Sequence, residues 1–187
     1  PWLRKGRSFE TLVSVRRLVE QKGFDMLLMA LAEVRRSRDV RLIIIGDGPL
    51  HASLVELATS LQIRKYVDLL GSRSNPYKYV SRADLFVLPS RWEGLGNVVI
   101  EALACGCPVV ATDCNFGPRE ILEGGRFGYL SAVNDPAALS AAILAALNEP
   151  LTSHRKSPIF LRQRANYFSR EASVEGYKSV LQKVIAS

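Results

Sequence analysis

The sequence has few of the side chains that usually bind metals or form disulfides. It contains only two histidines, His51 and His154, and three cysteines, Cys105, Cys107 and Cys114. A structural metal site would need a fourth ligand at a suitable spacing, and both histidines lie far from the cysteines in the sequence. The odd cysteine count favours reduced thiols in a cytosol, so we expect a cytoplasmic protein with cysteines that pack as small buried side chains.

Long hydrophobic runs are also absent. No stretch approaches the roughly 18 apolar residues of a membrane-spanning helix, and the N-terminus has no apolar signal region. The chain has 187 residues, of which 48% are hydrophobic and 23% are charged, as expected for one full globular core. Because it begins with Pro1 rather than Met, we expect it to be a fragment of a longer protein or a processed chain.

Negative charge is scarce at both ends of the chain. The net charge is +7, with ten Lys or Arg against five Asp or Glu in residues 1–41, and seven against two in residues 151–187. These basic ends suit a phosphate-bearing ligand or an anionic membrane surface, and a merely solvated surface is an equally open interpretation. No nucleic-acid partner is expected, because no zinc-finger spacing, RNA-binding signature or helix-turn-helix is found.

Apolar strand-like runs alternate with segments of helical periodicity. The predicted strands cover residues 11–18, 40–46, 66–71, 84–90, 108–113 and 127–132, and the predicted helices cover residues 22–36, 49–63, 76–83, 97–106, 117–124, 135–149 and 170–186. Strands that are apolar on both faces and alternate with helices predict an α/β fold with a doubly wound parallel sheet. We expect this sheet domain to span residues 1–150. The stretch 150–169 breaks the alternation and is interpreted as a crossing segment, so residues 151–187 form a second unit with the final helix.

Ligands of such folds bind beyond the carboxyl ends of the strands. Four loops that contain charged residues or glycines are expected there. "GDGP" (46–49) lacks the third glycine of a dinucleotide fingerprint, so a simple turn is favoured and a nicotinamide-dependent dehydrogenase is disfavoured. No Asp-x-Asp occurs in the sequence, which removes the usual cue for a metal that bridges a nucleotide diphosphate.

The loop "EGLGN" (93–97) and two cations supply a candidate anion site. Gly94 and Gly96 allow close approach to a ligand, and a helix that starts near Asn97 presents free N–H groups and the positive end of its dipole. A plain glycine turn into the helix is the alternative. Arg17 and Lys22, on another loop of the same edge, could bind a diphosphate or could be ordinary surface cations.

Two carboxylates flank this loop. Glu101 lies in an apolar helical segment, where a charge needs partners, and the vicinal hydroxyls of a ribose or a helix-face salt bridge would provide them. Glu93 precedes the glycines, further out on the edge. It could accept hydrogen bonds from sugar hydroxyls or be an exposed loop acid.

Several motifs in a fixed order resemble the retaining GT-B glycosyltransferases of the family-4 type. They are "RLVEQKG" (17–23), "GDGP" (46–49), "PSRWEGLGNVVIEALACGCPVVAT" (89–112) and "GPREIL" (117–122). The Glu-x7-Glu pair of that family corresponds here to Glu93 and Glu101, and the resemblance continues through the C-terminal "YFSREASVEGYKSVL". It implies the C-terminal, Rossmann-like donor domain of a two-domain enzyme, a retaining hexosyltransferase whose N-terminal acceptor domain is missing from this chain.

The resemblance also implies a role for each candidate residue. Arg17 and Lys22 would hold the donor diphosphate, Glu101 the ribose, and Glu93 the transferred sugar, so that Glu93, Arg17 and Lys22 are the catalytic set. Arg73 would lie near the base. The backbone of four residues would support phosphate and sugar: Gly94, Leu95, Gly96 and Asn97. No metal or cofactor is expected, the donor is a nucleotide diphosphate sugar with UDP favoured, and the departing diphosphate assists as base.

The sequence departs from the family pattern at one position, because the family usually has Gly before the phosphate arginine and this chain has Arg16. A strand end could tolerate it, or the loop could be altered. Similarity to enzymes of bacterial surface polysaccharides implies a glycan or lipid-linked acceptor at the cytoplasmic face of the inner membrane. A non-catalytic nucleotide-sugar binding module is the alternative function, although a nucleotide alone needs only Glu101. Without its partner domain the chain should bind nucleotide but transfer little, and we expect its C-terminal apolar side chains to be partly exposed: Ile159, Phe160, Leu161, Tyr167 and Phe168.

Overall fold

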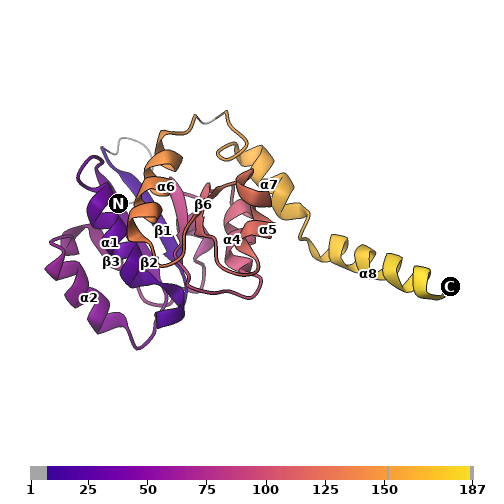
Figure 1. Cartoon of the computed structure of the whole chain (residues 1–187), viewed down its shortest axis with the longest axis horizontal. Helices are drawn as coiled ribbons and strands as arrows, with labels where there is room; N and C mark the ends of the chain where they lie inside the picture. Colours follow the sequence, from indigo (N-terminus) through magenta and orange to yellow (C-terminus); the bar gives the residue numbers. More distant parts are fainter. Residues whose placement is uncertain (1–7, 151, 186–187) are drawn as a thin grey trace.

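Six parallel strands form one sheet at the centre of the molecule. The computed structural model describes residues 8–150 and 152–185, apart from the side chain of Lys183. The strand order is β3-β2-β1-β4-β5-β6, and every pairing between these strands is parallel. The chain therefore winds outward from β1 in one direction and then from β4 in the other, with helices on both faces of the sheet (Figure 1). The expected doubly wound α/β fold is confirmed.

The strands are short, apolar and mostly inaccessible to solvent. They are β1 (Glu10–Val15), β2 (Val40–Ile45), β3 (Val67–Leu69), β4 (Leu85–Leu88), β5 (Val109–Thr112) and β6 (Tyr129–Ser131). All residues of β4 and β5 are buried, as expected for parallel strands covered on both faces. Every residue range predicted as a strand overlaps one of these strands, and all but the first contain the whole strand.

The helices also follow the predicted order. They are α1 (Phe24–Val34), α2 (His51–Ser60), α3 (Tyr77–Val80), α4 (Asn97–Ala104), α5 (Pro118–Ile121), α6 (Pro136–Asn148), α7 (Pro158–Asn166) and α8 (Arg170–Ile185). The start of α6 is fixed by Asp135, whose carboxylate accepts a hydrogen bond from the backbone N–H of Ala138 at 2.8 Å, with Pro136 as the first helical residue.

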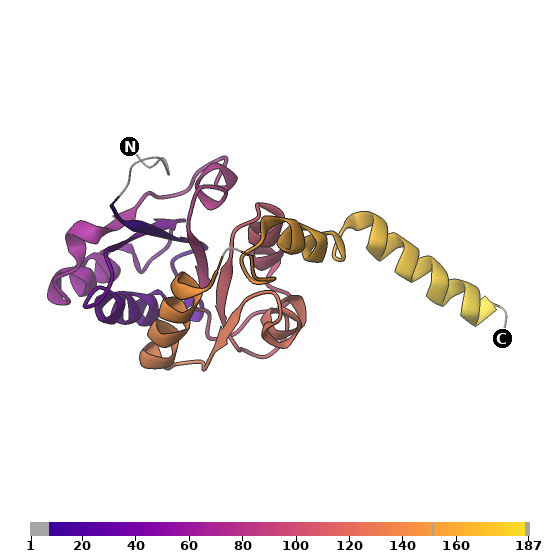
Figure 2. The same cartoon turned by 90° about the horizontal axis from the view of Figure 1, so that it is seen from above.

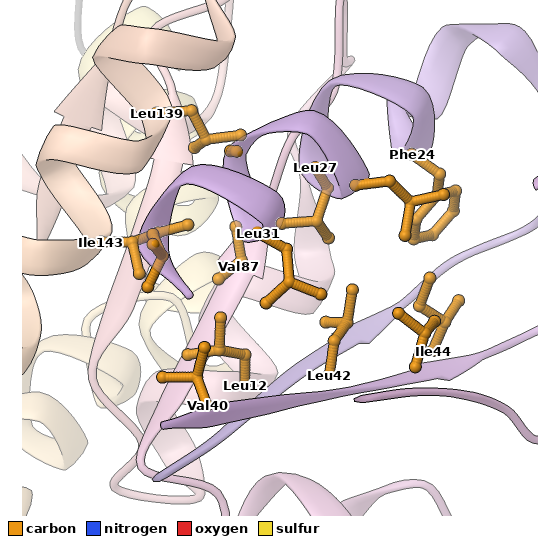
Figure 3. Packing of buried hydrophobic residues seen from close by; sticks show 14 of the residues in the cluster. Leu12, Phe24, Leu27, Leu31, Val40, Leu42, Ile44, Val87, Leu139 and Ile143 are labelled. Carbon is orange, nitrogen blue, oxygen red and sulfur yellow. The ribbon is translucent and has the colours of Figure 1, made fainter. Parts of the chain in front are cut away.

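Two hydrophobic clusters sandwich the sheet. One cluster joins α1, α2 and α6 to one face through residues such as Leu31, Leu42 and Ile143 (Figure 3). The other joins α4 and α7 to the opposite face through residues such as Phe86 and Leu103. Each fully buried Leu of these clusters stabilises the fold by about 1.5–3 kcal/mol. The sheet is thus rigid where its loops begin.

The elements differ from the sequence-based prediction mainly at their ends. The first strand was expected to reach residue 18 but ends at Val15, because Leu18 leaves the β1 register and its N–H donates to the carbonyl of Asp47 at 2.9 Å. The second helix ends at Ser60 rather than at residue 63. Gln62, two residues after this end, has a positive φ of 59° that does not fit a helix. The segment 150–169 contains no described sheet element, as expected, but it does contain the unpredicted helix α7.

The C-terminal region divides into a packed and an unpacked part. Helix α7 contacts α4, and its Leu161 is fully buried, so the expectation that this residue is partly exposed was wrong. Ile159 and Tyr167 are exposed by 66% and 68%, as expected. Helix α8 projects away from the sheet and its covering helices in both views (Figures 1 and 2). Within the described ranges, no helix combines the length and apolar character needed to cross a membrane.

Candidate donor site at the switch point of the sheet

The loops that follow β1 and β4 lie side by side, because these strands are neighbours although β2 and β3 separate them in the sequence. In doubly wound sheets this switch point is where ligands bind. Gly23 has a φ of 62°, and a Cβ atom there would lie 2.1 Å from the carbonyl oxygen of Pro89. Only glycine permits this approach, which brings the predicted residues Lys22 and Glu93 together.

Glu93 is the most enclosed charged group of this loop pair. Its side chain is only 6% exposed, so the expectation of an outlying loop acid was wrong. Its Oε1 accepts hydrogen bonds from Lys22 Nζ at 2.9 Å and from Ser90 Oγ at 2.7 Å, and it forms an ion pair with Arg16 Nη2 at 3.5 Å. Among the described residues, Glu93 Oε2 has no hydrogen-bond partner, so one oxygen is held while the other is available to a ligand.

The two adjacent arginines occupy different environments. Arg16, treated from the sequence as a departure from the family pattern, turns inward toward Glu93, and its side chain is 21% exposed. Arg17, predicted to hold a diphosphate, is exposed, and within the described residues its guanidinium has no hydrogen bond or ion pair. The structure therefore brings Lys22 to Glu93 but leaves the guanidinium of Arg17 in solvent, without a contact to either residue.

A second set of contacts locks the same two loops together. Arg91, after β4, donates to both carboxylate oxygens of Asp25 on α1, at 3.0 and 2.6 Å, and to the carbonyl of Glu20 at 2.7 Å. Gln21 Nε2 donates to the carbonyl of Trp92 at 3.0 Å. Burial alone would raise the pKa of Asp25, but the hydrogen bonds and charge of Arg91 outweigh it and lower the pKa below its usual value.

The start of α4 leaves room for a ligand. Gly96, with a φ of 77°, is the N-cap residue, and no side chain caps the helix. Gly94 has neither a positive φ nor any atom within 4 Å of the position of a Cβ, so the packing of the protein does not require glycine there. Leu95 and Asn97 are exposed and line an open pocket of about 400 Å³ that Tyr167 and Phe168 close on another side. The uncapped N–H groups therefore face accessible space.

Glu101 lies one turn further along α4. It is partly exposed and, within the part of the chain that the structure describes, its carboxylate makes no hydrogen bond or ion pair. The alternative of a helix-face salt bridge is therefore not seen. Burial raises the pKa of the Cys105 thiol, and the negative charge of Glu101 raises it further. Glu101 thus keeps its full capacity to accept hydrogen bonds.

The GDGP loop supports its neighbours rather than forming a dinucleotide fingerprint. A Cβ at Gly46 would lie 1.9 Å from the carbonyl oxygen of Arg16, so glycine lets the loop after β1 pass closely. The Asp47 carboxylate accepts a hydrogen bond from the N–H of Ser72 at 2.8 Å, which is the main cause of its lowered pKa. Arg73 is exposed on this paired loop. The turn interpretation of GDGP is consistent with these contacts.

Sequence reasoning did not find Ser90 and Thr112, which support Glu93 from the ends of β4 and β5. Ser90 is fully buried, and Thr112 at the end of β5 donates to its carbonyl oxygen. Cys114 is buried nearby, and burial raises the pKa of its thiol, which the charge of Glu93 raises further. A buried Ser and Thr at the carboxyl ends of neighbouring apolar strands were the available signal. The three cysteines are free, with Cys107 and Cys114 buried, and the described residues contain no cluster suited to a metal ion.

The fold matches a known class of protein. Its arrangement is that of GT-B glycosyltransferase structures, and the solved structures similar to this chain include TarM from S. aureus and sucrose-phosphate synthase from Thermosynechococcus elongatus. TarM has a TM-score of 0.81 and 25% identity, and the match covers 92% of this chain and 36% of TarM. The synthase has a TM-score of 0.80 and 26% identity, with 96% and 46% covered. The TarM structure contains UDP.

The family follows from the sequence comparisons. A family model described as Glycosyl transferases group 1 matches residues 3–160, and the chain belongs to this family. It is 32% identical over 170 residues to the lipopolysaccharide core biosynthesis glycosyltransferase LpsE of Rhizobium meliloti, covering 91% of this chain and 49% of LpsE. It is 36% identical over 138 residues to an N-acetylgalactosaminyltransferase of Campylobacter jejuni that acts on a diphospho-undecaprenol-linked sugar, covering 74% and 37%. The chain thus spans half or less of these relatives.

Proposed function

We propose that this chain is the donor-binding domain of a retaining glycosyltransferase and that it binds a nucleotide diphosphate sugar, with UDP favoured as the nucleotide. The observation that carries the proposal is Glu93, which is held on one oxygen by Lys22 and Ser90 and lies four residues before Asn97, the exposed and uncapped start of α4. The UDP in the TarM structure supports the choice of nucleotide.

The diphosphate would be bound by cations and by backbone N–H groups. Lys22 Nζ, at 2.9 Å from Glu93, lies where a phosphate next to the sugar would be neutralised. Arg17 is exposed beside it and can reach a phosphate from the open side. The backbone from Gly94 to Asn97 would add N–H donors and the positive end of the α4 dipole.

The two glutamates would bind the two sugars of the donor. Glu101 has an unpaired carboxylate one turn into α4, as required for the vicinal hydroxyls of the ribose. Glu93 Oε2 would accept from hydroxyls of the transferred sugar. The open space at Gly94 would let that sugar approach the backbone. Arg73, on the loop after β3, would lie toward the base.

In the proposed reaction the acceptor hydroxyl attacks the anomeric carbon while the bond from that carbon to the diphosphate oxygen breaks. The hydroxyl proton passes to the departing diphosphate, and configuration is retained. Lys22 and Arg17 would stabilise the charge that develops on the leaving group. Glu93, Arg17 and Lys22 are therefore the proposed catalytic set.

The remaining residues would connect the donor domain, residues 1–150, to an acceptor domain. In this proposal residues 151–187 cross back toward that domain and pack against it through α8. The exposed apolar side chains Val174, Tyr177 and Leu181 follow a helical spacing that suits such packing. The lipid-linked sugar acceptor named for the C. jejuni relative supports an acceptor of that kind, presented at the cytoplasmic membrane surface near the basic ends of this chain.

Titration of the chain with UDP, GDP, ADP and NAD tests the donor site. We expect UDP to bind most tightly and NAD not to bind. If none of them bound above background, the proposal would lose its basis, and binding of NAD alone would replace it with a dehydrogenase function. A non-catalytic nucleotide-sugar binding module is the second candidate. Sugar transfer by the longer protein would eliminate it.

A further inference from the structure

The guanidinium of Arg16 has buried donor atoms without a hydrogen-bond partner among the described residues, unlike the exposed Arg17 and the hydrogen-bonded Lys22. Its Nε and Nη2 atoms are buried and have no hydrogen-bond partner, since the 3.5 Å approach of Nη2 to Glu93 is an ion pair without hydrogen-bond geometry. A guanidinium carries five N–H donors and no acceptor, so leaving two of its nitrogens unpaired is costly. Arg16 therefore gains more than a satisfied arginine would when an acceptor arrives.

The local charge determines which acceptor fits. Lys22 and Arg16 both approach Glu93 Oε1, so two positive charges share one negative charge in a partly enclosed site. The excess positive charge favours an anionic ligand over a neutral sugar hydroxyl. The planar fork of a guanidinium matches phosphate oxygens, which can accept two parallel hydrogen bonds.

The position of Arg16 gives it access to such a ligand. It follows β1 directly at the switch point, and its backbone N–H donates to the carbonyl of Ile45 at 3.0 Å, which fixes the base of the side chain. With 21% of the side chain exposed, rotation about its own torsions can turn Nε and Nη2 toward the start of α4.

We propose that Arg16 is an additional phosphate-binding residue, whose Nε and Nη2 bind the second, sugar-bearing phosphate of the donor. This inference rests on the proposed donor site. In the empty site Arg16 pairs with Glu93. When the donor binds, Arg16 turns to the phosphate and leaves Glu93 with Lys22 and Ser90. The arginine that departs from the family pattern would thus strengthen diphosphate binding.

The experiment compares the dissociation constants of UDP, UMP and UDP-glucose by calorimetry for the 187-residue chain and three variants. Arg16→Ala removes the guanidinium, and Arg16→Gln keeps most of its length and an N–H donor for Glu93. Arg36→Ala removes the same charge from an exposed site at the far end of α1 as a control. We expect Arg16→Ala and Arg16→Gln to weaken UDP and UDP-glucose by about 10- to 100-fold and UMP by less than about threefold, with Arg36→Ala unchanged.

The other outcomes overturn the inference in distinguishable ways. Equal losses of affinity for UMP and UDP would mean that Arg16 acts only through the general shape or electrostatic field of the site. A loss confined to UDP-glucose would mean that it acts only by holding Glu93. Unchanged UDP binding by folded variants would remove Arg16 from the site. If the unsubstituted chain bound none of UDP, GDP and ADP, the proposed donor function itself would fail.

Discussion

The loop cluster at the switch point and the helix α8 show opposite degrees of internal support. At the switch point, Lys22, Ser90 and Arg16 surround Glu93, and Arg91 ties the same loops together through Asp25. Along α8, by contrast, Val174, Tyr177 and Leu181 are exposed by 44%, 75% and 59%, and the helix projects from the body (Figure 2). The first region is held in place by contacts within this chain, whereas the apolar face of the second can be buried only by another surface.

The largest effect is expected from a substitution in the ion pair between Lys22 and Glu93. In the longer protein, Lys22→Ala should cost about 2–4 kcal/mol of transition-state stabilisation, because the diphosphate gains charge as it leaves. Steady-state kcat/KM measures the loss. Lys65→Ala, which removes a charge from the short helical turn before β3, is the control. Activity of the Lys22 variant within twofold of the unsubstituted enzyme would rule out its role.

Substitution of two glycines near the switch point should affect different properties, stability in one case and UDP binding in the other. Gly117 has a φ of 86°, and a Cβ there would lie 2.0 Å from the carbonyl oxygen of Leu95, so Gly117→Ala should lower the free energy of unfolding by about 2–3 kcal/mol. The Cβ that Gly94→Ala adds would have no atom within 4 Å. This variant should therefore change the free energy of unfolding by less than about 0.5 kcal/mol while weakening UDP binding. Urea denaturation and UDP titration of both variants measure these effects. Unchanged UDP binding by Gly94→Ala would mean that no ligand uses that space.

The Arg91–Asp25 pair tests how firmly the loops are joined. Because the Asp25 side chain is 38% exposed, Arg91→Ala should cost only about 1 kcal/mol at pH 7. The folded state lowers the pKa of Asp25 below the ordinary value of 3.8, so this contribution is complete above that pH and is lost as the pH falls through the folded-state pKa. The difference between the unfolding free energies of the two proteins, measured between pH 7 and pH 2.5, should therefore be constant above about pH 4 and become smaller as the pH falls further. A difference that stayed constant over the whole range would show that the carboxylate charge is not involved.

The smallest effect is expected on α8. Replacing Tyr177 and Leu181 by Ser should change the free energy of unfolding of this chain by no more than about 0.5 kcal/mol, because both side chains are already exposed. Leu161→Ala, at a fully buried position of α7, should cost about 2–5 kcal/mol and serves as the comparison. Denaturant titration measures both. If the α8 variant were destabilised as strongly as the α7 variant, α8 would have a partner surface within this chain.

Much of the fold could be predicted because its signals are local. An apolar run such as residues 40–45 can satisfy its backbone and bury its side chains only inside a covered sheet, and Asp135 followed by Pro136 marks a helix start. Helix α7 was missed because its segment is polar and contains prolines. Its main signal, Leu161 and Ala165 four residues apart, is buried only through tertiary packing.

The candidate site could be predicted in composition but not in arrangement. Spacing along the chain placed Glu93 and Glu101 around a helix start, and the apolar surroundings of Glu101 indicated a carboxylate in need of partners, either a ribose or a salt bridge. The pattern could not show that Glu93 is enclosed, because Lys22 and Arg16 reach it across the neighbouring loop, 71 and 77 positions away in the sequence. Adjacent arginines look alike in a sequence, and only the direction in which the chain leaves β1 separates their environments.

The sequence by itself determined the alternation of strands and helices, the edge of the sheet on which the chemistry lies, and the residue types gathered there. These follow from periodicity and from the rule that parallel strands end at one edge. Only the tertiary structure decided which cation meets which carboxylate, which glycines are required by close backbone contacts and which face open space, and that α8 has an unburied apolar face. Such contacts depend on distances between loops far apart in the sequence, and strand order and packing set those distances.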